Sequence, residues 1–101
     1  MNTITTKVVG VSFEGRQTHI SKLTPETKLY LVPEPDNIYD SNAIQVIDEN
    51  NNRLGYIPKN QALKLKKKFG ENIKEKYDIS HFDRYGGGYR KNYGLEITFK
   101  I

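Results

Sequence analysis

The segment at residues 84–93 has the residue types with which proteins recognise nucleic acids, because aromatic rings alternate with cations around three glycines. Its sequence is Arg84-Tyr85-Gly86-Gly87-Gly88-Tyr89-Arg90-Lys91-Asn92-Tyr93. Aromatic rings stack on exposed bases, at roughly 1–3 kcal/mol per base in single-strand binders, and cations neutralise phosphates. Because a duplex hides its base faces, this composition favours a single strand or a strand end. The alternative is a solvated hairpin loop whose tyrosines pack on their own strands.

The sequence contains no metal site of recognisable spacing. Asp48, Asn50 and Asn52 are spaced like the first ligands of an EF-hand loop. That loop also needs a glycine and a final glutamate, which are replaced here by Arg53 and Lys59, so the segment predicts a hairpin turn instead. The two histidines lack a second histidine at helical spacing, and the chain has no cysteine. We therefore expect no zinc site and no thiol chemistry.

No catalytic motif is recognisable either. The serines lack the glycine-flanked turn that presents a hydrolase nucleophile. The glycines at 86–88 are not followed by Lys-Ser or Lys-Thr and do not open an expected helix, which excludes a phosphate-binding loop of the nucleotide hydrolases. We expect a protein that is not an enzyme and needs no cofactor.

The charge is distributed unevenly along the chain. Residues 1–52 hold four basic and seven acidic side chains, whereas residues 53–101 hold twelve basic and five acidic ones. The formal net charge of +4 hides this contrast. Such an asymmetry favours a polyanionic partner, most commonly nucleic acid. The alternative is a solvated, lysine-rich surface.

The length of 101 residues fits one small domain, which we assign to residues 1–101. The absence of cysteine is typical of a reducing compartment. Neither a signal peptide nor an apolar run near the ~18 residues of a membrane span is recognisable. We expect a soluble, intracellular monomer, in the nucleus of a eukaryote or with the nucleoid of a bacterium.

Short alternating runs separated by turn residues predict strands near 9–13, 29–32, 44–46, 54–57, 77–82 and 95–101. One helix is predicted between them at 60–69, capped by Asn60 and ended by Gly70. Five to six strands with one inserted helix predict a mainly β fold. We expect a small, partly open β-barrel of the OB-like or SH3-like kind.

Three stretches together resemble the HIRAN domain, and the resemblance covers nearly the whole chain. They are Val8-Val9-Gly10-Val11, the Asn-x-Tyr-Asp-x-Asn-Ala-Ile core at residues 37–44, and Gly-Tyr-Ile-Pro at residues 55–58. The resemblance implies a modified OB-like barrel that binds DNA, alone or fused to a helicase or nuclease. In helicase-type members this domain captures the 3′-hydroxyl end of single-stranded DNA during fork reversal.

The family's binding residues correspond to a small set of positions in this sequence. The resemblance implies that Phe13 stacks on a terminal base, that Lys59 contacts a phosphate, and that a late aromatic is Phe82 or Tyr85. It also implies a Tyr-Asp pair, here Tyr39 and Asp40. One departure is the serine at position 12, where the helicase-type domain has an arginine. The missing charge could come from one of three other residues, namely Arg16, Arg84 or Arg90.

Asp40 is an unusual residue for a phosphate-binding loop, because a carboxylate repels phosphate. It is explained if the carboxylate accepts a hydrogen bond from a hydroxyl and so distinguishes a free 3′-hydroxyl from a 3′-phosphate. The alternative is a loop-fixing role, with the carboxylate bonded to the backbone amides of Asn42 or Ala43.

The leading hypothesis is therefore a non-catalytic module that grips single-stranded DNA at its 3′-hydroxyl end, in DNA repair or replication-fork processing. The residues expected to contact DNA are Phe13, Tyr39, Asp40, Lys59, Phe82, Arg84, Tyr85, Tyr89, Arg90 and Lys91. The expected partners are the DNA end and a helicase or nuclease, in the same chain or another. The alternative is an SH3-like peptide- or protein-docking module accessory to such an enzyme.

Overall fold

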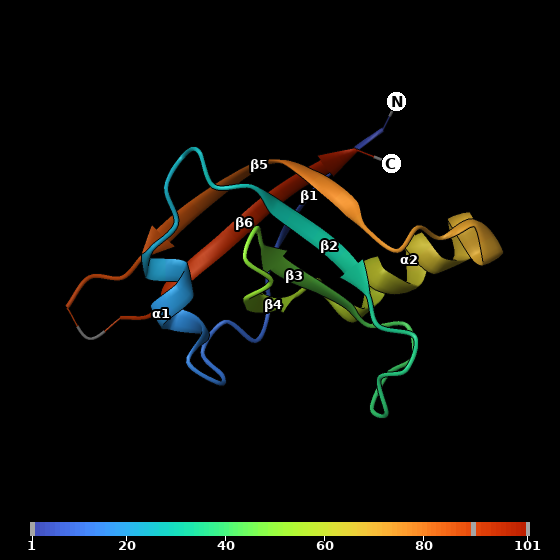
Figure 1. Ribbon diagram of the computed structural model, residues 1–101, viewed down its shortest axis with the longest axis horizontal. Helices are drawn as coiled ribbons and strands as arrows, with labels where there is room; N and C mark the ends of the chain where they lie inside the picture. Colours follow the sequence, from blue (N-terminus) through green and yellow to red (C-terminus); the bar gives the residue numbers. More distant parts are fainter. Residues whose placement is uncertain (1, 90, 101) are drawn as a thin grey trace.

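The computed structural model describes residues 2–89 and 91–100. Its elements are shown in Figure 1 and follow in chain order. They are β1 (Thr3–Lys7), α1 (Arg16–Ser21), β2 (Leu29–Pro33), β3 (Ile44–Asp48), β4 (Arg53–Tyr56), α2 (Lys59–Phe69), the 3₁₀ turn η1 (Gly70–Asn72), β5 (Tyr77–Gly86) and β6 (Tyr93–Lys100). The two α-helices lie toward opposite ends of the long axis of the molecule (Figure 1).

The strands form one antiparallel sheet in the order β1-β6-β5-β2-β3-β4, which curls into a half-barrel. Its two edges meet where Val9, just after β1, pairs with Tyr56 at the end of β4. Each backbone N–H of this pair donates to the other residue's carbonyl, at 2.8 and 2.9 Å. The predicted fold class, a small OB-like barrel of mainly β structure, is confirmed.

Gly55 makes this closure possible, because the backbone of the opposite segment lies directly against it. A Cβ atom at this position would lie 2.5 Å from the carbonyl oxygen of Val9 and 2.6 Å from Cγ1 of Val8. Its φ of 157° is also one that side chains with a Cβ rarely adopt. The glycine of the Gly-Tyr-Ile-Pro stretch is therefore required by packing.

β6 lies inside the sheet and supplies much of the core. Leu95, Ile97 and Phe99 are fully buried, and the residues between them are partly exposed. Burial of such side chains contributes about 1.5–3 kcal/mol each. The predicted alternation of this strand is confirmed, and Ile101, expected on the same face, lies outside the described residues.

The predicted strand at residues 9–13 is wrong, since the first strand is β1, at Thr3–Lys7. In the segment predicted as a strand only Val9 pairs with the sheet. Gly10 and Gly15, both with φ of 72°, and Glu14, with φ of 54°, turn the chain instead. β1 lies at the edge of the sheet and contributes one apolar side chain to the core, that of Ile4. It therefore lacks the alternation that would have marked it.

The predicted helix is confirmed as α2, with its expected buried face and its terminal glycine. Asn60, predicted to cap it, lies inside its first turn. α2 begins at Lys59, and Pro58 takes the cap position with a φ of −57° and no side-chain cap. The ring of proline already fixes φ near the helical value, and its carbonyl accepts the first helical hydrogen bonds. Within residues 2–89 and 91–100, no helix is long and apolar enough to cross a membrane.

α1 has no counterpart in the prediction, because long-range bonds hold it and only Ile20 supplies a buried apolar side chain. The Gln17 amide nitrogen donates to the carbonyls of Val11 and Tyr93, at 2.9 and 3.0 Å. The Tyr93 N–H donates to the Gln17 side-chain oxygen at 2.7 Å. No local periodicity encodes such contacts.

The predicted hairpin turn between β3 and β4 is confirmed. One oxygen of Asp48 accepts hydrogen bonds from the N–H groups of Asn50 and Asn52, both at 2.9 Å. Its other oxygen accepts one from the Asn52 side chain at 3.0 Å. The carboxylate therefore organises the turn. Among the residues that the structure describes, no three acidic or histidine side chains are grouped so that they could hold a metal ion.

Replacement of Gly55 by alanine tests the closure of the barrel. The new methyl group would collide with backbone, so we expect Gly55→Ala to lower the free energy of unfolding by about 2–3 kcal/mol. Urea denaturation measures this loss. Gly88→Ala is the matched control, because nothing lies within 4 Å of a Cβ atom there. Equal stability of the two variants would contradict the role of Gly55.

Candidate nucleic-acid interface

An open groove of about 800 Å³ lies between the loop 34–43, the segment 9–16, β4 and the start of α2. The loop projects from the lower edge of the molecule in Figure 1, below α2. All three stretches that carry the family resemblance contribute to the walls. Val9 comes from the first and Tyr56 and Ile57 from the third, and the second supplies Asn37, Ile38, Tyr39, Asp40 and Ala43. The groove is the candidate site.

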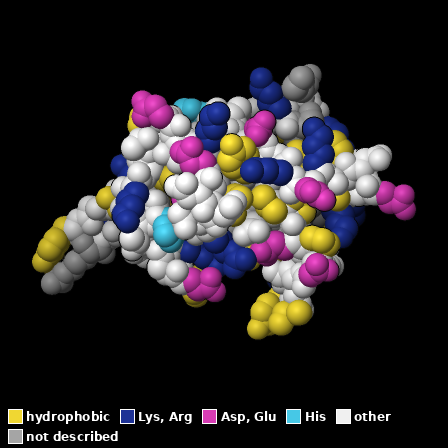
Figure 2. Space-filling model, in the orientation of Figure 1, with side chains coloured by type: hydrophobic (Ala, Val, Ile, Leu, Met, Phe, Trp, Pro, Cys, Tyr) yellow, Lys and Arg dark blue, Asp and Glu magenta, His cyan; other side chains and the backbone are white. Residues whose placement is uncertain are grey.

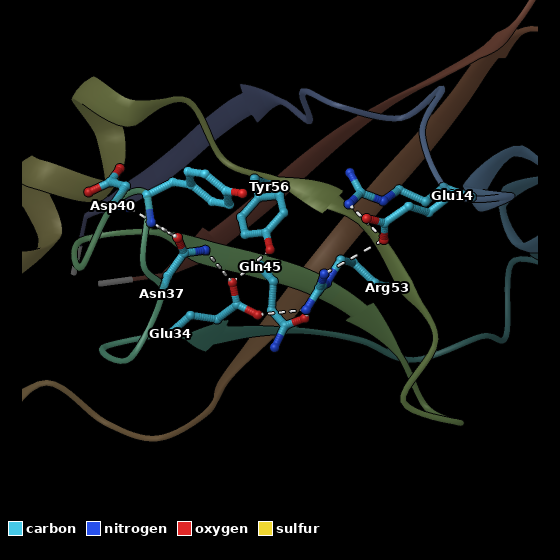
Figure 3. A network of polar contacts seen from close by, with 9 residues as sticks. Glu14, Glu34, Asn37, Asp40, Gln45, Arg53 and Tyr56 are labelled. Carbon is cyan, nitrogen blue, oxygen red and sulfur yellow. Dashed lines mark hydrogen bonds and ion pairs between the residues drawn. The ribbon is translucent and has the colours of Figure 1, made fainter.

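The conformation of the loop is set by Asn37. Its side-chain oxygen accepts hydrogen bonds from the N–H groups of Tyr39 and Asp40, at 2.9 and 3.0 Å, and its nitrogen donates to Glu34 at 3.1 Å (Figure 3). An asparagine that bonds to the following backbone in this way stabilises a tight turn. The turn leaves Ile38 and Tyr39 protruding, with 87% and 91% of their surface exposed. Two large apolar side chains therefore face solvent on an ordered loop.

Asp40 is half-buried in the groove wall. Its Oδ1 atom accepts a hydrogen bond from the N–H of Asn42 at 2.9 Å. The loop-fixing role is therefore real for one carboxylate oxygen. Within the described part of the chain no donor forms a hydrogen bond with Oδ2, so this oxygen can accept one from a ligand.

The base of the groove is a polar network centred on Glu34. The Tyr56 hydroxyl donates to Oε1 of Glu34 at 2.6 Å, and Nη2 of Arg53 donates to Oε2 at 2.8 Å (Figure 3). The guanidinium groups of Arg16 and Arg53 each lie 5.5 Å from the centre of the Tyr56 ring. Burial, and then the hydrogen bond to Glu34, raise the pKa of Tyr56. The phenol is therefore held in its neutral form.

The comparison with known families agrees with this geometry. The sequence model of the HIRAN domain matches residues 1–78. The chain belongs to the HIRAN domain family. HIRAN domains are DNA-binding domains, so a DNA-binding role follows from membership. No curated protein and no solved structure matches the chain.

The structure brings three of the predicted contact residues of this HIRAN domain together, since Tyr39, Asp40 and Lys59 all line the groove. Phe13 is exposed on the segment that supplies one wall. Phe13 itself is not among the described residues that line the groove, so its contact with DNA stays a prediction.

The remaining predicted residues belong to β5 and the β5–β6 hairpin, beyond the part matched by the family. The hairpin extends to the end of the molecule away from the loop 34–43 (Figure 1). Phe82 is half-buried against the core, whereas Tyr85, Tyr89 and Lys91 are exposed. Arg90 lies outside the described residues. The structure therefore separates these side chains from the groove, and their contact with DNA stays a prediction.

Arg84 has a structural partner. One of its terminal nitrogens donates to the carbonyl oxygens of Ile20, Ser21 and Leu23, at 3.1, 2.9 and 3.1 Å. These carbonyls end α1, where a cation is favourable. The guanidinium also lies 5.0 Å from the ring centre of Tyr93. Arg84 therefore fastens the end of α1 to the hairpin.

The groove is not strongly positive. Its charged lining residues are Arg16, Arg53, Lys59, Glu14, Glu34, Asp36 and Asp40. Three cations face four carboxylates, a formal balance of −1. Figure 2 likewise shows acidic and basic side chains interspersed over one face, with hydrophobic tips at its lower edge and at its left end. The groove therefore offers shape and single polar contacts more than a bulk positive charge.

The site also contains residues that motif matching did not single out. Glu34 and Arg53 hold the network under the loop, and neither was a predicted contact. The only available signals were the position of Glu34 before Pro35 and of Arg53 before the Gly-Tyr-Ile-Pro strand. Their pairing arises from sheet register, since Arg53 also donates to Gln45 across the strands at 3.0 Å.

Substitution of Arg84 tests its structural role. We expect Arg84→Gln to lower the free energy of unfolding by about 1–2 kcal/mol, because three carbonyls lose a charged donor. Thermal or urea unfolding measures the loss. Lys91→Gln removes the same charge from the exposed hairpin and should leave stability nearly unchanged. An Arg84 variant as stable as the Lys91 variant would contradict the fastening role.

The raised pKa of Tyr56 predicts a stability loss at high pH. The unfolded chain releases this proton near pH 10, before the folded protein does. Unfolding therefore becomes more favourable as the pH rises above that value, by up to about 1.4 kcal/mol per pH unit. Urea denaturation between pH 8 and 11 should show a steeper loss for the wild type than for Tyr56→Phe. Tyr39→Phe, at an exposed ring, should follow the wild-type curve.

Proposed function

We propose that this HIRAN domain captures the 3′-hydroxyl end of single-stranded DNA in the groove. The observation that carries the proposal is the convergence of an exposed ring, a carboxylate and a lysine, those of Tyr39, Asp40 and Lys59, on one groove. A terminal nucleotide offers a matching set: a base face, a hydroxyl and a phosphate.

The ring of Tyr39 is available for stacking at little structural cost, because it is 91% exposed in the free protein. Burial against a terminal base would remove that apolar face from water and add stacking energy, roughly 1–3 kcal/mol. Phe13, which is exposed on the segment that supplies one wall of the groove, would supply a second face. Both rings would stack on bases that are not paired in a duplex.

Asp40 would distinguish a free 3′-hydroxyl from a 3′-phosphate or a continuing strand. Oδ1 holds the loop, and Oδ2 can accept the hydrogen bond of a 3′-hydroxyl. A 3′-phosphate would place two negative charges beside the same carboxylate, and a continuing strand would place one. The carboxylate therefore favours the end that carries no charge.

Lys59 supplies the phosphate contact together with the start of α2. It is the first residue of an eleven-residue helix, whose unpaired N–H groups and dipole favour an anion. This placement suits the last phosphodiester of the strand. The role agrees with the one that the family resemblance assigns to this lysine.

The domain acts in this proposal as a non-catalytic monomer that delivers a DNA end to a helicase or nuclease, in the same chain or in a partner. Repair or fork processing is the setting in which free 3′ ends arise. Every group that the proposal uses comes from one chain.

Peptide docking is the second candidate, favoured by the protruding Ile38 and by the balanced charge of the groove. The two candidates differ in salt dependence. A complex held by phosphate contacts weakens steeply as salt rises, whereas an apolar peptide complex does not.

Asp40→Asn tests the end-reading role. The amide keeps an oxygen for the N–H of Asn42, so we expect the thermal midpoint to stay within a few degrees. The charge that rejects a 3′-phosphate is lost, so the preference for a 3′-hydroxyl oligonucleotide over its 3′-phosphate form should fall about tenfold. Fluorescence anisotropy with both oligonucleotides measures the preference.

Asp36→Asn is the control for this experiment, because it removes the same charge from the same groove wall. Its preference should match that of the wild type. Equal affinity of the wild type for both oligonucleotides would refute end reading, and binding that is insensitive to salt would favour peptide docking.

A further inference from the structure

The arginines at the base of the groove form an arrangement that the proposed end contacts do not use. The guanidinium groups of Arg16 and Arg53 both approach the ring of Tyr56 (5.5 Å to its centre). Arg16 is almost completely buried, with 7% of its side chain exposed, whereas Arg53 remains partly open to solvent. Two cations therefore lie close together in the floor of a DNA-binding domain.

These arginines have unused donor capacity. Nε of Arg16 is buried and has no hydrogen-bond partner among the described residues. Nη1 of Arg16 donates to the Gly10 carbonyl at 2.6 Å. Nη1 of Arg53 has one partner in the described part of the chain, an ion pair with Glu14 at 3.8 Å. A buried guanidinium donor without a partner is costly, and the Arg53 donor is paired only at long distance, so neither arginine is fully satisfied.

Glu14 occupies the position between the two cations, but loosely. Its Oε2 atom lies 3.4 Å from Nη2 of Arg16 and 3.8 Å from Nη1 of Arg53 (Figure 3). Good charge-assisted hydrogen bonds are about 2.7–2.9 Å long. The Glu14 side chain is 68% exposed, so water can replace its partners at little cost.

The backbone around Glu14 is suited to movement. Glu14 itself has a φ of 54°, a conformation that is unfavourable for a residue with a side chain. Gly10 and Gly15 flank the segment, both with φ of 72°. A change of conformation between these glycines would relieve the strain and carry the carboxylate away from the arginines.

The charge count also fits an exchange of anions. Glu14 and Glu34 together balance the two arginines, and Glu34 is held firmly by Arg53 at 2.8 Å and by the Tyr56 hydroxyl at 2.6 Å. Departure of Glu14 alone would leave one positive charge facing the groove. A phosphodiester carries one negative charge and presents planar arginines with oxygen acceptors like those of a carboxylate.

We propose that Arg16 and Arg53 form a second phosphate subsite, which Glu14 occupies until DNA displaces it. The ligand is a backbone phosphodiester of the bound strand, upstream of the terminal nucleotide. This inference rests on the proposed binding of single-stranded DNA in the groove. It assigns to Glu14 the role of a competing anion, so that weak or non-specific anions are kept out.

Glu14→Gln tests the subsite in the full chain. The probe is a short 5′-fluorescein-labelled oligothymidine with a 3′-hydroxyl, titrated by fluorescence anisotropy. We expect the variant to bind it about two- to fivefold more tightly than the wild type, because an exposed competing ion pair is removed. Glu49→Gln makes the same charge change in the exposed β3–β4 turn and should gain less. Thermal unfolding verifies that both variants are folded.

A second measurement locates the phosphate. Oligothymidines that carry one uncharged methylphosphonate linkage, moved stepwise from the 3′ end, are titrated against wild type and Glu14→Gln. The tighter binding of the Glu14→Gln variant should disappear when the uncharged linkage stands at one particular internal position. Arg53→Lys in the Glu14→Gln background should also abolish the gain, because lysine keeps the charge but lacks the guanidinium fork.

The outcomes distinguish this inference from the proposed function. If the wild type binds and Glu14→Gln gains no more than Glu49→Gln, the subsite is refuted while single-strand binding stands. A gain that no single neutral linkage removes also refutes it. If neither the wild type nor Glu14→Gln binds the probe, both proposals fail. Binding by Glu14→Gln alone would support the competing role of Glu14.

Discussion

The pairing of Val9 with Tyr56 is the constraint on which the groove depends. Two backbone hydrogen bonds join the two edges of the sheet and fix the position of Tyr56 at the end of β4. Two guanidinium groups then lie 5.5 Å from the centre of its ring, and its hydroxyl donates a hydrogen bond to Glu34. Glu34 in turn anchors Asn37, which shapes the protruding loop. Barrel closure and loop conformation are thus one connected structure, and Gly55 provides the space that it needs.

The sequence predicted the elements whose local pattern is strong. β6 alternates strictly, and α2 ends at a glycine after a buried stripe, so both were found within a few residues. β1 and α1 were missed for a physical reason. β1 is an edge strand with a single core contact, and α1 is held by Gln17 and Arg84 through side-chain bonds to distant backbone. Such contacts exist only after the chain has folded.

In the candidate site, too, local motifs predicted some residues, whereas contacts made only in the folded chain were missed. Tyr39, Asp40 and Lys59 could be named from contiguous motifs, and they do line one groove. The network beneath them depends on register between strands, which the motifs do not contain. The charge asymmetry along the chain was also a poor guide, because the groove itself is nearly balanced. The groove therefore offers a few individually placed polar groups and no strongly positive surface.

The strand order has a consequence for the limits of the domain. The family match ends at residue 78, before most of β5 and all of β6. Yet these two strands lie between β1 and β2 in the sheet, so they are its middle and not an appendage. A fragment cut at the end of the matched region would leave β1 without a neighbour and would lose Leu95, Ile97 and Phe99 from the core. The sheet and its core therefore extend well beyond the stretch of sequence by which the family is recognised.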